Sequence, residues 1–294
     1  MNARVFTGSG VALATPFTDD GINFEAYGKL IEWQIASGTD ALVACGTTGE
    51  PSTMTVDEKL DVISFAVEKG AGRVPVIAGT GGNDTREAVA QSRQAQKLGA
   101  DALLVVTPYY NKTTQRGLVA HFHAIADAVD IPIIIYNVPT RTGLNMTAET
   151  LNKLSEHPNI CGMKEASADI TQITEMARLC GDKIALYSGN DDHVLPMLAL
   201  GGQGVISVVA NIAPRQMREL VAAYLAGDIY RSRQLQFALN PLTKQLFSEV
   251  NPIPVKTALR MMGYDMGPLR LPLIDMAQSN LNSLSAAMKE FGLI

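Results

Sequence analysis

The sequence predicts an α/β fold, a TIM (β/α)8 barrel with a small C-terminal helical appendage, and two features of the chain support this prediction. Eight short runs are apolar throughout, as expected for strands of a parallel sheet that is covered on both faces. Most of the segments between these runs carry helix signals. Eight strand–helix units within about 225 residues match the size and rhythm of such a barrel.

The eight predicted strands are distributed along the first three quarters of the chain. In chain order they are GVALATPF (10–17), DALVACG (40–46), VPVIAGTG (74–81), ADALLVVTP (100–108), IPIIIYNVP (131–139), NICGMKEAS (159–167), KIALYSGN (183–190) and GVISVVA (204–210). An open doubly wound sheet is the alternative architecture. It would need a phosphate-binding fingerprint after an early strand, and the glycine-rich GTGGND (79–84) does not fit the spacing G-x-G-x-x-G.

Helix signals lie between the predicted strands. Asn23 can cap a helix whose apolar residues at 24, 27, 31 and 35 share one face and which ends at Gly38. The segment 55–58 reads Thr-Val-Asp-Glu, a capping box, and apolar residues at 56, 60, 63 and 67 again share one face. Apolar residues between 217 and 225 predict a helix after the eighth strand.

The chain is expected to divide into a barrel catalytic domain, residues 1–225, and a C-terminal helical appendage, residues 226–294. The appendage shows helical patterning over 230–249, a proline break at NPIP (251–254), a helix near 255–262 and a last helix near 276–290. A chain of 294 residues, 47% of them hydrophobic, is large enough to bury a core of this size.

The composition argues against several classes of function. A net charge of −5 and the lack of a Lys/Arg cluster make nucleic acid an unexpected partner. Cys45, Cys161 and Cys180 are odd in number and lack C-x-x-C spacing, which argues against disulfides or a zinc site and is typical of a reducing compartment. No apolar run reaches the ~18 residues of a spanning helix, and no signal-peptide pattern is present. We therefore expect no metal, no membrane partner and a cytoplasmic location.

Barrel enzymes keep their active sites at the C-terminal ends of the strands, so the polar residues there are candidates. The sixth strand ends at Lys164. A lysine in apolar surroundings loses its proton more readily, because desolvation disfavours the cation. Its neutral amine can form a Schiff base with a ketone, which is an electron sink for carbon–carbon bond chemistry. The other strand ends are GTTGE (46–50), GTGGN (79–83), TPYYN (107–111), YNVPTRTG (136–143) and SGND (188–191).

Further side chains supply what this chemistry needs. Tyr136, on the strand beside that of Lys164, is the candidate for proton transfer. Thr47, Thr48 and the backbone amides near them suit a small carboxylate. Arg141 suits a second carboxylate through its planar fork.

Each candidate has a plainer alternative when it is taken alone. Lys164 could reach solvent or pair with Glu165, although neighbours on a strand face opposite sides. Tyr136 could be a packed aromatic residue, the threonine pair could serve a turn, and Arg141 could be a surface residue. Their combination at the strand ends of one barrel favours function. None of the four histidines is assigned to catalysis or to metal binding.

Four of these motifs together resemble a known family. GTTGE, TPYYN, YNVPTRTG and KEAS (164–167) are similar to those of the dihydrodipicolinate synthases, within the pyruvate-dependent class I aldolases, and the resemblance covers nearly the whole chain. GTTGE with the strand-six lysine is typical of the superfamily. The double tyrosine and the arginine after YNVP are typical of the synthases, whereas N-acetylneuraminate lyases usually have Ser in the second position of GTTGE and lack that arginine.

The resemblance implies an aldolase-type lyase that joins pyruvate to L-aspartate 4-semialdehyde and yields 4-hydroxytetrahydrodipicolinate, on the route to diaminopimelate and lysine, with no metal or organic cofactor. Lys164 would condense with pyruvate. Tyr136 would transfer protons in a relay with Thr47 and with Tyr110 of a second subunit. Substrate contacts would come from Thr48, Arg141, the carbonyl of Gly189 and the backbone of Ile206, with Arg141 holding the carboxylate of the semialdehyde. Family members are commonly homotetramers built as dimers of dimers.

Some relatives are inhibited by L-lysine, which binds at the dimer interface. Val56 and Lys59 stand where strongly inhibited bacterial relatives have histidines. Because the Lys59 ammonium would repel the ammonium groups of a lysine ligand, we expect weak or absent inhibition. The positions that match the lysine site are Pro51, Ser52, Val56, Lys59, Asn83, Glu87 and Tyr109.

Two other functions stay open at this point. The first is another aldolase of the superfamily, acting on a sialic acid or a 2-keto-3-deoxy sugar acid, and Arg141 and Tyr110 argue against it. The second is a non-catalytic relative that kept the fold and binds or senses a small molecule. Reductive trapping of pyruvate on Lys164 would distinguish the enzyme from the binding protein.

Overall fold

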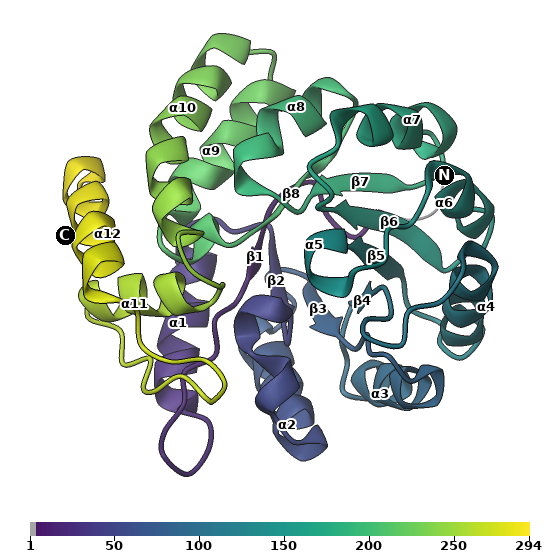
Figure 1. Ribbon diagram of the computed structural model, residues 1–294, viewed down its shortest axis with the longest axis horizontal. Helices are drawn as coiled ribbons and strands as arrows, with labels where there is room; N and C mark the ends of the chain where they lie inside the picture. The colour runs from purple at the N-terminus through teal and green to yellow at the C-terminus, as the bar shows by residue number, and fades with distance from the viewer. Residues whose placement is uncertain (1–3) are drawn as a thin grey trace.

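The computed structural model describes residues 4–294 and closes eight parallel strands into one barrel (Figure 1). The strands are β1 (Gly8–Ala12), β2 (Ala41–Ala44), β3 (Val76–Gly79), β4 (Ala102–Val106), β5 (Ile133–Asn137), β6 (Ile160–Glu165), β7 (Ala185–Ser188) and β8 (Gly204–Ser207). Because β8 returns to pair with β1, the predicted barrel is confirmed and the open sheet is excluded. Residues 1–3 of the predicted barrel domain lie outside the described residues.

Helices surround the barrel and follow it (Figure 1). They are α1 (Phe24–Ala36), α2 (Val56–Gly70), α3 (Thr85–Lys97), α4 (Gln115–Ala126), α5 (Pro139–Thr142), α6 (Ala148–Leu154), α7 (Ile170–Cys180), α8 (Val194–Ala199), α9 (Pro214–Leu225), α10 (Ile229–Leu246), α11 (Ile253–Met261) and α12 (Gln278–Phe291). In residues 4–294, no helix combines the length and the apolar character that crossing a membrane requires.

The observed strands are shorter than the predicted runs, and the first one is displaced. β1 begins at Gly8, before the predicted start at residue 10, because Gly8 and Ser9 already pair with Gly204 and Val205 of β8. Gly8 has φ +126, and a Cβ at this position would lie 2.1 Å from a carboxylate oxygen of Asp40. The polar ends of the predicted strands leave the sheet, as at Pro139, which already opens α5.

The predicted helix starts are present. The side-chain oxygen of Asn23 accepts a hydrogen bond from the Ala26 N–H at 3.1 Å, and Gly38 follows the end of α1 with φ +88. Thr55 and Glu58 form both bonds of the capping box, at 2.9 and 3.1 Å. Caps of this kind stabilise a helix by about 1 kcal/mol, so α1 and α2 begin where the sequence predicts.

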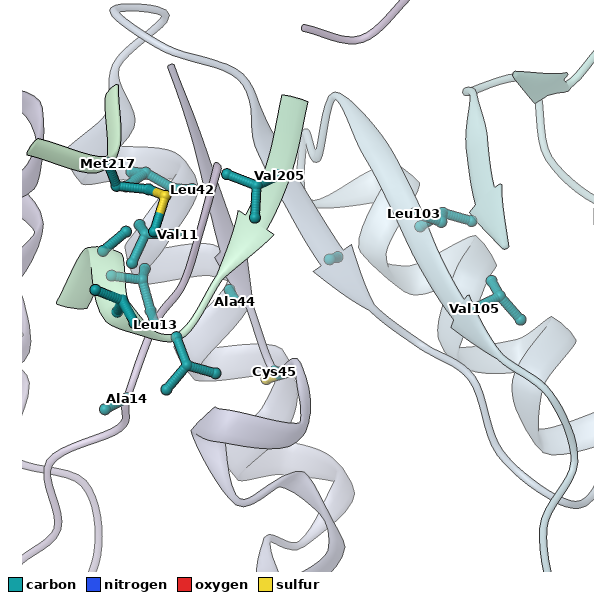
Figure 2. Packing of buried hydrophobic residues seen from close by; sticks show 14 of the residues in the cluster. Val11, Leu13, Ala14, Leu42, Ala44, Cys45, Leu103, Val105, Val205 and Met217 are labelled. Atoms are coloured by element: carbon teal, nitrogen blue, oxygen red, sulfur yellow. The ribbon is translucent and has the colours of Figure 1, made fainter. Parts of the chain in front are cut away.

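Buried apolar side chains form two layers. Outward-facing strand residues such as Val11 and Leu42 share one cluster with helix residues such as Met217 of α9 (Figure 2). Inward-facing residues form the second layer. At its N-terminal end the Phe6 ring stacks on Tyr187 with ring centroids 4.5 Å apart, and the Tyr187 hydroxyl donates to the Phe6 carbonyl at 2.6 Å. Aromatic side chains therefore fill the end of the barrel opposite to the predicted site.

The C-terminal helices pack on one another and on the barrel. α10 lies along α9, and α12 contacts both α10 and α11 (Figure 1). The segment after α11 returns to α1, where the rings of Tyr264 and Trp33 have centroids 5.4 Å apart and Asp265 accepts from the Asn23 side chain at 2.9 Å. The division at residues 225 and 226 stays a prediction, and the structure places the end of α9 at Leu225.

Candidate active site

Lys164 lies inside the barrel near the C-terminal end of β6. Met163 belongs to the outer layer of the core, so the alternation along the strand turns Lys164 inward. Its side chain is 5% exposed. Tyr136 occupies the paired position on β5, and the Lys164 Nζ lies 4.3 Å from the centre of its ring. The fold thus brings the predicted nucleophile against the predicted proton carrier.

The surroundings of Lys164 favour the neutral amine. Burial lowers the pKa of Lys164 from 10.5 to about 8, and the positive charge of Arg141 acts in the same direction. The negative charge of Asp191 opposes both and raises the pKa. With such a pKa, about one tenth of the side chain is unprotonated at pH 7, which is enough for attack on a carbonyl.

Asp191 is a charged neighbour of Lys164 that the sequence analysis did not identify. It follows β7 and is 2% exposed. Its Oδ2 accepts from the backbone N–H groups of Val208 and Val209 at 3.0 and 3.2 Å, and burial raises its pKa. The available signal was its place in the strand-end segment SGND. That place is equally typical of a turn residue, so the electrostatic role became visible only in the fold.

Tyr136 and Thr47 meet at the wall of one cavity. Burial raises the pKa of Tyr136, while the charge of Arg141 and a hydrogen bond with the Thr47 side chain act in the opposite direction. All three side chains line a cavity of about 350 Å³ at the mouth of the barrel. A phenol that keeps its proton and contacts a second hydroxyl can donate and accept protons there.

Thr47 and Thr48 are held in a tight turn of two successive 3-10 helices after β2. Left-handed backbone at Cys45 (φ +56) and Glu50 (φ +57) brackets this turn. Gly79 on β3 lets the turn approach closely, because a Cβ there would lie 2.1 Å from the Cys45 carbonyl oxygen. The sequence identified the two threonines but not the strained residues on either side of them.

Asn251 joins two predicted substrate-binding residues. Its side-chain Nδ2 donates to the Thr48 Oγ1 at 3.0 Å, and its carbonyl oxygen accepts from the Arg141 Nη2 at 3.1 Å. Asn251 belongs to the NPIP segment, where the sequence indicated only a break between helices. The C-terminal appendage therefore contacts the candidate site directly, which the sequence did not predict.

Gly189 and Ile206 lie on the β7 and β8 side of Lys164. The Gly189 N–H donates to the Glu165 carbonyl at 2.7 Å, and a Cβ at Gly189 would lie 2.7 Å from that of Ala166. Ile206 is 1% exposed and pairs with Gly10 of β1. Gly189 therefore comes directly after β7, the neighbour of β6, whereas Ile206 lies on β8, which closes the barrel by pairing with β1.

Tyr110 is placed apart from the other candidates. It is 91% exposed, in the loop after β4, with a left-handed φ of +66. Within one chain it is therefore not brought to Thr47 and Tyr136. Its neighbour Tyr109 is 39% exposed and lines the cavity.

The positions that match a lysine-binding site fall into two groups. Pro51, Ser52, Lys59 and Tyr109 line the same cavity as Thr47, Tyr136 and Arg141. The others lie outside this lining: Val56 is 46% exposed, the Glu87 carboxylate accepts from Gln91 at 2.7 Å, and the Asn83 carbonyl accepts from Asn111 at 2.9 Å. In a single chain, one cavity thus spans the predicted substrate side and part of the predicted effector side.

The Glu165 carboxylate is engaged away from Lys164. It accepts from the Asn137 side chain at 2.9 Å and from the Ser167 N–H at 2.6 Å. Among the described residues, no three His, Cys, Asp or Glu side chains are grouped so that they could hold a metal ion. The functional groups assembled around Lys164 are thus its own amine, a phenol, hydroxyls, a guanidinium and the Asp191 carboxylate.

Comparison with known proteins identifies close relatives over the full chain. The dihydrodipicolinate synthetase family matches residues 5–291. The 4-hydroxy-tetrahydrodipicolinate synthase of Thermoanaerobacter sp. (strain X514) is 60% identical over 291 residues, which cover 99% of this chain and 98% of the relative. That of Clostridium perfringens (strain 13 / Type A) is 54% identical over 290 residues, 99% of this chain and 100% of the relative.

Solved structures of dihydrodipicolinate synthases have the same fold and match this chain over nearly its whole length. Dihydrodipicolinate synthase from Aquifex aeolicus superposes with a TM-score of 0.96 at 49% identity, covering 98% of this chain and 99% of that one. The enzyme from Thermotoga maritima gives 0.97 at 43% identity, covering 99% and 100%. A structure described as the first monomeric dihydrodipicolinate synthase variant also gives 0.97 at 43% identity, covering 99% and 98%.

Proposed function

The chain belongs to the dihydrodipicolinate synthetase family, and we propose that it carries out the reaction of that family through a Schiff base on Lys164. It is an aldolase-type lyase that condenses pyruvate with L-aspartate 4-semialdehyde, in the biosynthesis of diaminopimelate and lysine. The observation that supports the assignment to Lys164 is its buried amine, with a pKa near 8, beside the Tyr136 ring.

The first half of the reaction activates pyruvate. The neutral amine of Lys164 attacks the ketone carbon, and the resulting carbinolamine loses water to give a protonated Schiff base. Loss of a methyl proton then gives the enamine, whose carbon attacks the aldehyde of the second substrate. Tyr136 donates a proton to the departing water and to the new alkoxide, and it accepts the proton that the methyl group loses. Thr47 is the next hydroxyl in the proton relay. The protonated Schiff base on Lys164 acts as the electron sink, so the route requires no metal or organic cofactor.

The carboxylates of the substrates have separate partners. Thr48 and the backbone of Ile206 are proposed to contact bound pyruvate, and the Gly189 carbonyl to hold water or substrate nearby. Arg141 lines the same cavity as Tyr136 and offers a planar pair of donors to the carboxylate of the semialdehyde. Its positive charge also lowers the pKa of Lys164, so one side chain serves binding and activation.

We further propose that the protein works as an oligomer, as a tetramer built from two dimers. The 91% exposed Tyr110 supports this proposal, because a second subunit would have to bring it to the site of the first. One similar solved structure is described as a monomeric variant, and the sedimentation of this chain in solution distinguishes a tetramer from such a monomer. The free thiols of Cys45, Cys161 and Cys180 support a cytoplasmic location.

Reductive trapping tests the proposal. Borohydride added in the presence of pyruvate should fix a pyruvyl group on Lys164, detected as added mass on the peptide that contains this residue. Lys164→Ala should abolish trapping. Turnover should follow with L-aspartate 4-semialdehyde and not with the aldehyde partners of sialic acid or sugar-acid aldolases. A folded protein that traps no pyruvate would contradict the proposal and favour a binding protein.

A further inference from the structure

Glu50 and Lys256 form a buried ion pair between the turn that carries the catalytic threonines and the C-terminal appendage. The Lys256 Nζ donates to the Glu50 Oε1 at 2.8 Å and to the Pro268 carbonyl at 2.9 Å. The two charged side chains are 0% and 1% exposed. The same ammonium lies 4.3 Å from the centre of the Phe17 ring. A cation on α11 is thus enclosed by three separate parts of the chain.

Stability alone gives a poor account of this pair. Taking two charges out of water costs more than their attraction commonly returns, and apolar side chains of similar volume often stabilise a fold at least as well. Burial lowers the pKa of Lys256 to about 8, so the enclosure itself opposes the charge. A role in the geometry of the neighbouring site explains better why the pair is present.

The position of Glu50 indicates that role. It ends the motif GTTGE in a left-handed conformation with φ +57, and its N–H donates to the Thr47 carbonyl at 3.1 Å. A residue other than glycine keeps this backbone only when its surroundings hold it. The carboxylate is held by Lys256 on one oxygen and by the Arg270 N–H at 3.3 Å on the other. The appendage therefore fixes the end of the turn.

We propose that Glu50 and Lys256 are positioning residues for the reaction at Lys164. They hold the turn so that the Thr47 hydroxyl meets Tyr136, and they act through the backbone of the turn without touching a substrate. The inference rests on the proposed function, because that function gives Thr47 its part in proton transfer. The C-terminal appendage then supports the active site, in addition to packing against the helices.

Paired variants test this role. Glu50→Gln and the double variant Glu50→Gln with Lys256→Met remove the charges with little change in volume. We expect the folded double variant to lose about ten-fold or more in kcat and to show a raised KM for pyruvate, because displaced hydroxyls no longer align with the reacting atoms. Asp275→Asn is the matched control, since it breaks an exposed ion pair with Arg260 of the same helix, at 2.9 Å. This control should leave kcat and KM unchanged.

The results for these variants distinguish a failure of the positioning role from a failure of the proposed function. A double variant that melts cooperatively and keeps kcat and KM for pyruvate within about two-fold of the unaltered protein would overturn the positioning role. If the double variant does not fold, Glu50→Gln, which keeps an oxygen acceptor for Lys256, is judged by the same criterion. Pyruvate trapping on Lys164 in the unaltered protein is measured beside these variants. Failure of that trapping overturns the proposed function, whereas trapping with unaffected variants overturns only the positioning role.

Discussion

The ammonium nitrogen of Lys164 lies 4.3 Å from the centre of the Tyr136 ring, at paired positions on β6 and β5. Strand pairing brings these two side chains together, because the backbones of neighbouring strands in a sheet lie about 4.8 Å apart. Lys164 is buried at this contact, and its burial lowers the pKa of the amine. The face of a ring also attracts a cation, so the same contact suits the protonated Schiff base that follows.

The rate of pyruvate capture should rise with pH. Only the neutral amine of Lys164 attacks the ketone, and its pKa is about 8. We expect kcat/KM for pyruvate to increase about ten-fold per unit below pH 8 and to level off above it. Steady-state kinetics from pH 6 to 9.5 would test this expectation. A profile that is flat between pH 6 and pH 8 would contradict the assignment of this rise in kcat/KM to Lys164.

Removing the catalytic amine should stabilise the fold. The pKa of Lys164 in the folded chain is about 8, below its unfolded value near 10.4, so between these values the unfolded chain binds more protons and stability rises with pH. Below pH 8 the buried cation costs the folded state on the order of 3 kcal/mol. Lys164→Met should therefore raise the free energy of unfolding at pH 7 by up to that amount, as measured by urea titration.

Lys256→Met is the matched comparison for that experiment. Lys256 has the same lowered pKa but lies against the Glu50 carboxylate. Its removal leaves a buried charge without its partner and should destabilise the chain by about 3 kcal/mol or more. If Lys164→Met and Lys256→Met change the free energy of unfolding equally and in the same direction, the ion pair with Glu50 does not determine the effect of removing Lys256.

Most of the fold could be predicted because the barrel repeats a simple pattern. Apolar runs bounded by Gly and polar residues gave the eight strands, and caps such as Asn23 and Thr55 gave the helix starts. The start of β1 was missed because the close approach of the Asp40 side chain leaves room only for glycine at position 8, which leaves no apolar pattern. Local sequence reports what a residue prefers and cannot report which distant backbone approaches it.

The same limit explains what was found and missed at the site. Lys164 and Tyr136 were found because each is a reactive side chain at a strand end. Asn251 and Lys256 were missed because their partners, Thr48 and Glu50, are 203 and 206 residues away in the chain. Neither NPIP nor the apolar face of a helix indicates such a contact. Only the closed fold brings the end of the chain to the turn after β2.

L-Lysine should inhibit weakly or not at all. Lys59 lines the cavity beside Ser52 and Tyr109, where its ammonium would repel a cationic ligand. Half-inhibition at a lysine concentration below about 1 mM would contradict this prediction. Lys59→Met removes the repulsion and should lower the inhibitory concentration, while Lys59→Arg, which keeps the charge, should not.

Tyr110 should act on the site of a neighbouring subunit. Tyr110→Phe is expected to lower kcat without changing the sedimentation behaviour, because only a hydroxyl on a 91% exposed side chain is lost. Mixing Tyr110→Phe and Lys164→Ala chains before assembly gives a sharper test. In mixed dimers, the site with Lys164 receives an intact Tyr110, so about one quarter of the unaltered activity should return. If Tyr110 acts within its own chain, no activity returns on mixing.

Arg141 should have two separable effects. Its positive charge lowers the pKa of Lys164, and its guanidinium is proposed to hold the carboxylate of the semialdehyde. Arg141→Met removes a like charge, so the pKa of Lys164 should rise and the increase of kcat/KM for pyruvate with pH should move to higher pH. The same variant should raise the KM for the semialdehyde about ten- to a hundred-fold.

Arg141→Lys distinguishes these two effects. It keeps the charge, so the pH dependence of kcat/KM for pyruvate should stay close to that of the unaltered protein. It lacks the planar pair of donors, so the KM for the semialdehyde should stay raised while the KM for pyruvate changes little. An unchanged KM for the semialdehyde in both variants would remove Arg141 from substrate binding. If the pH dependence shifts in Arg141→Met but not in Arg141→Lys, Arg141 still contributes to the activation of Lys164. The reason is that only Arg141→Met loses the positive charge.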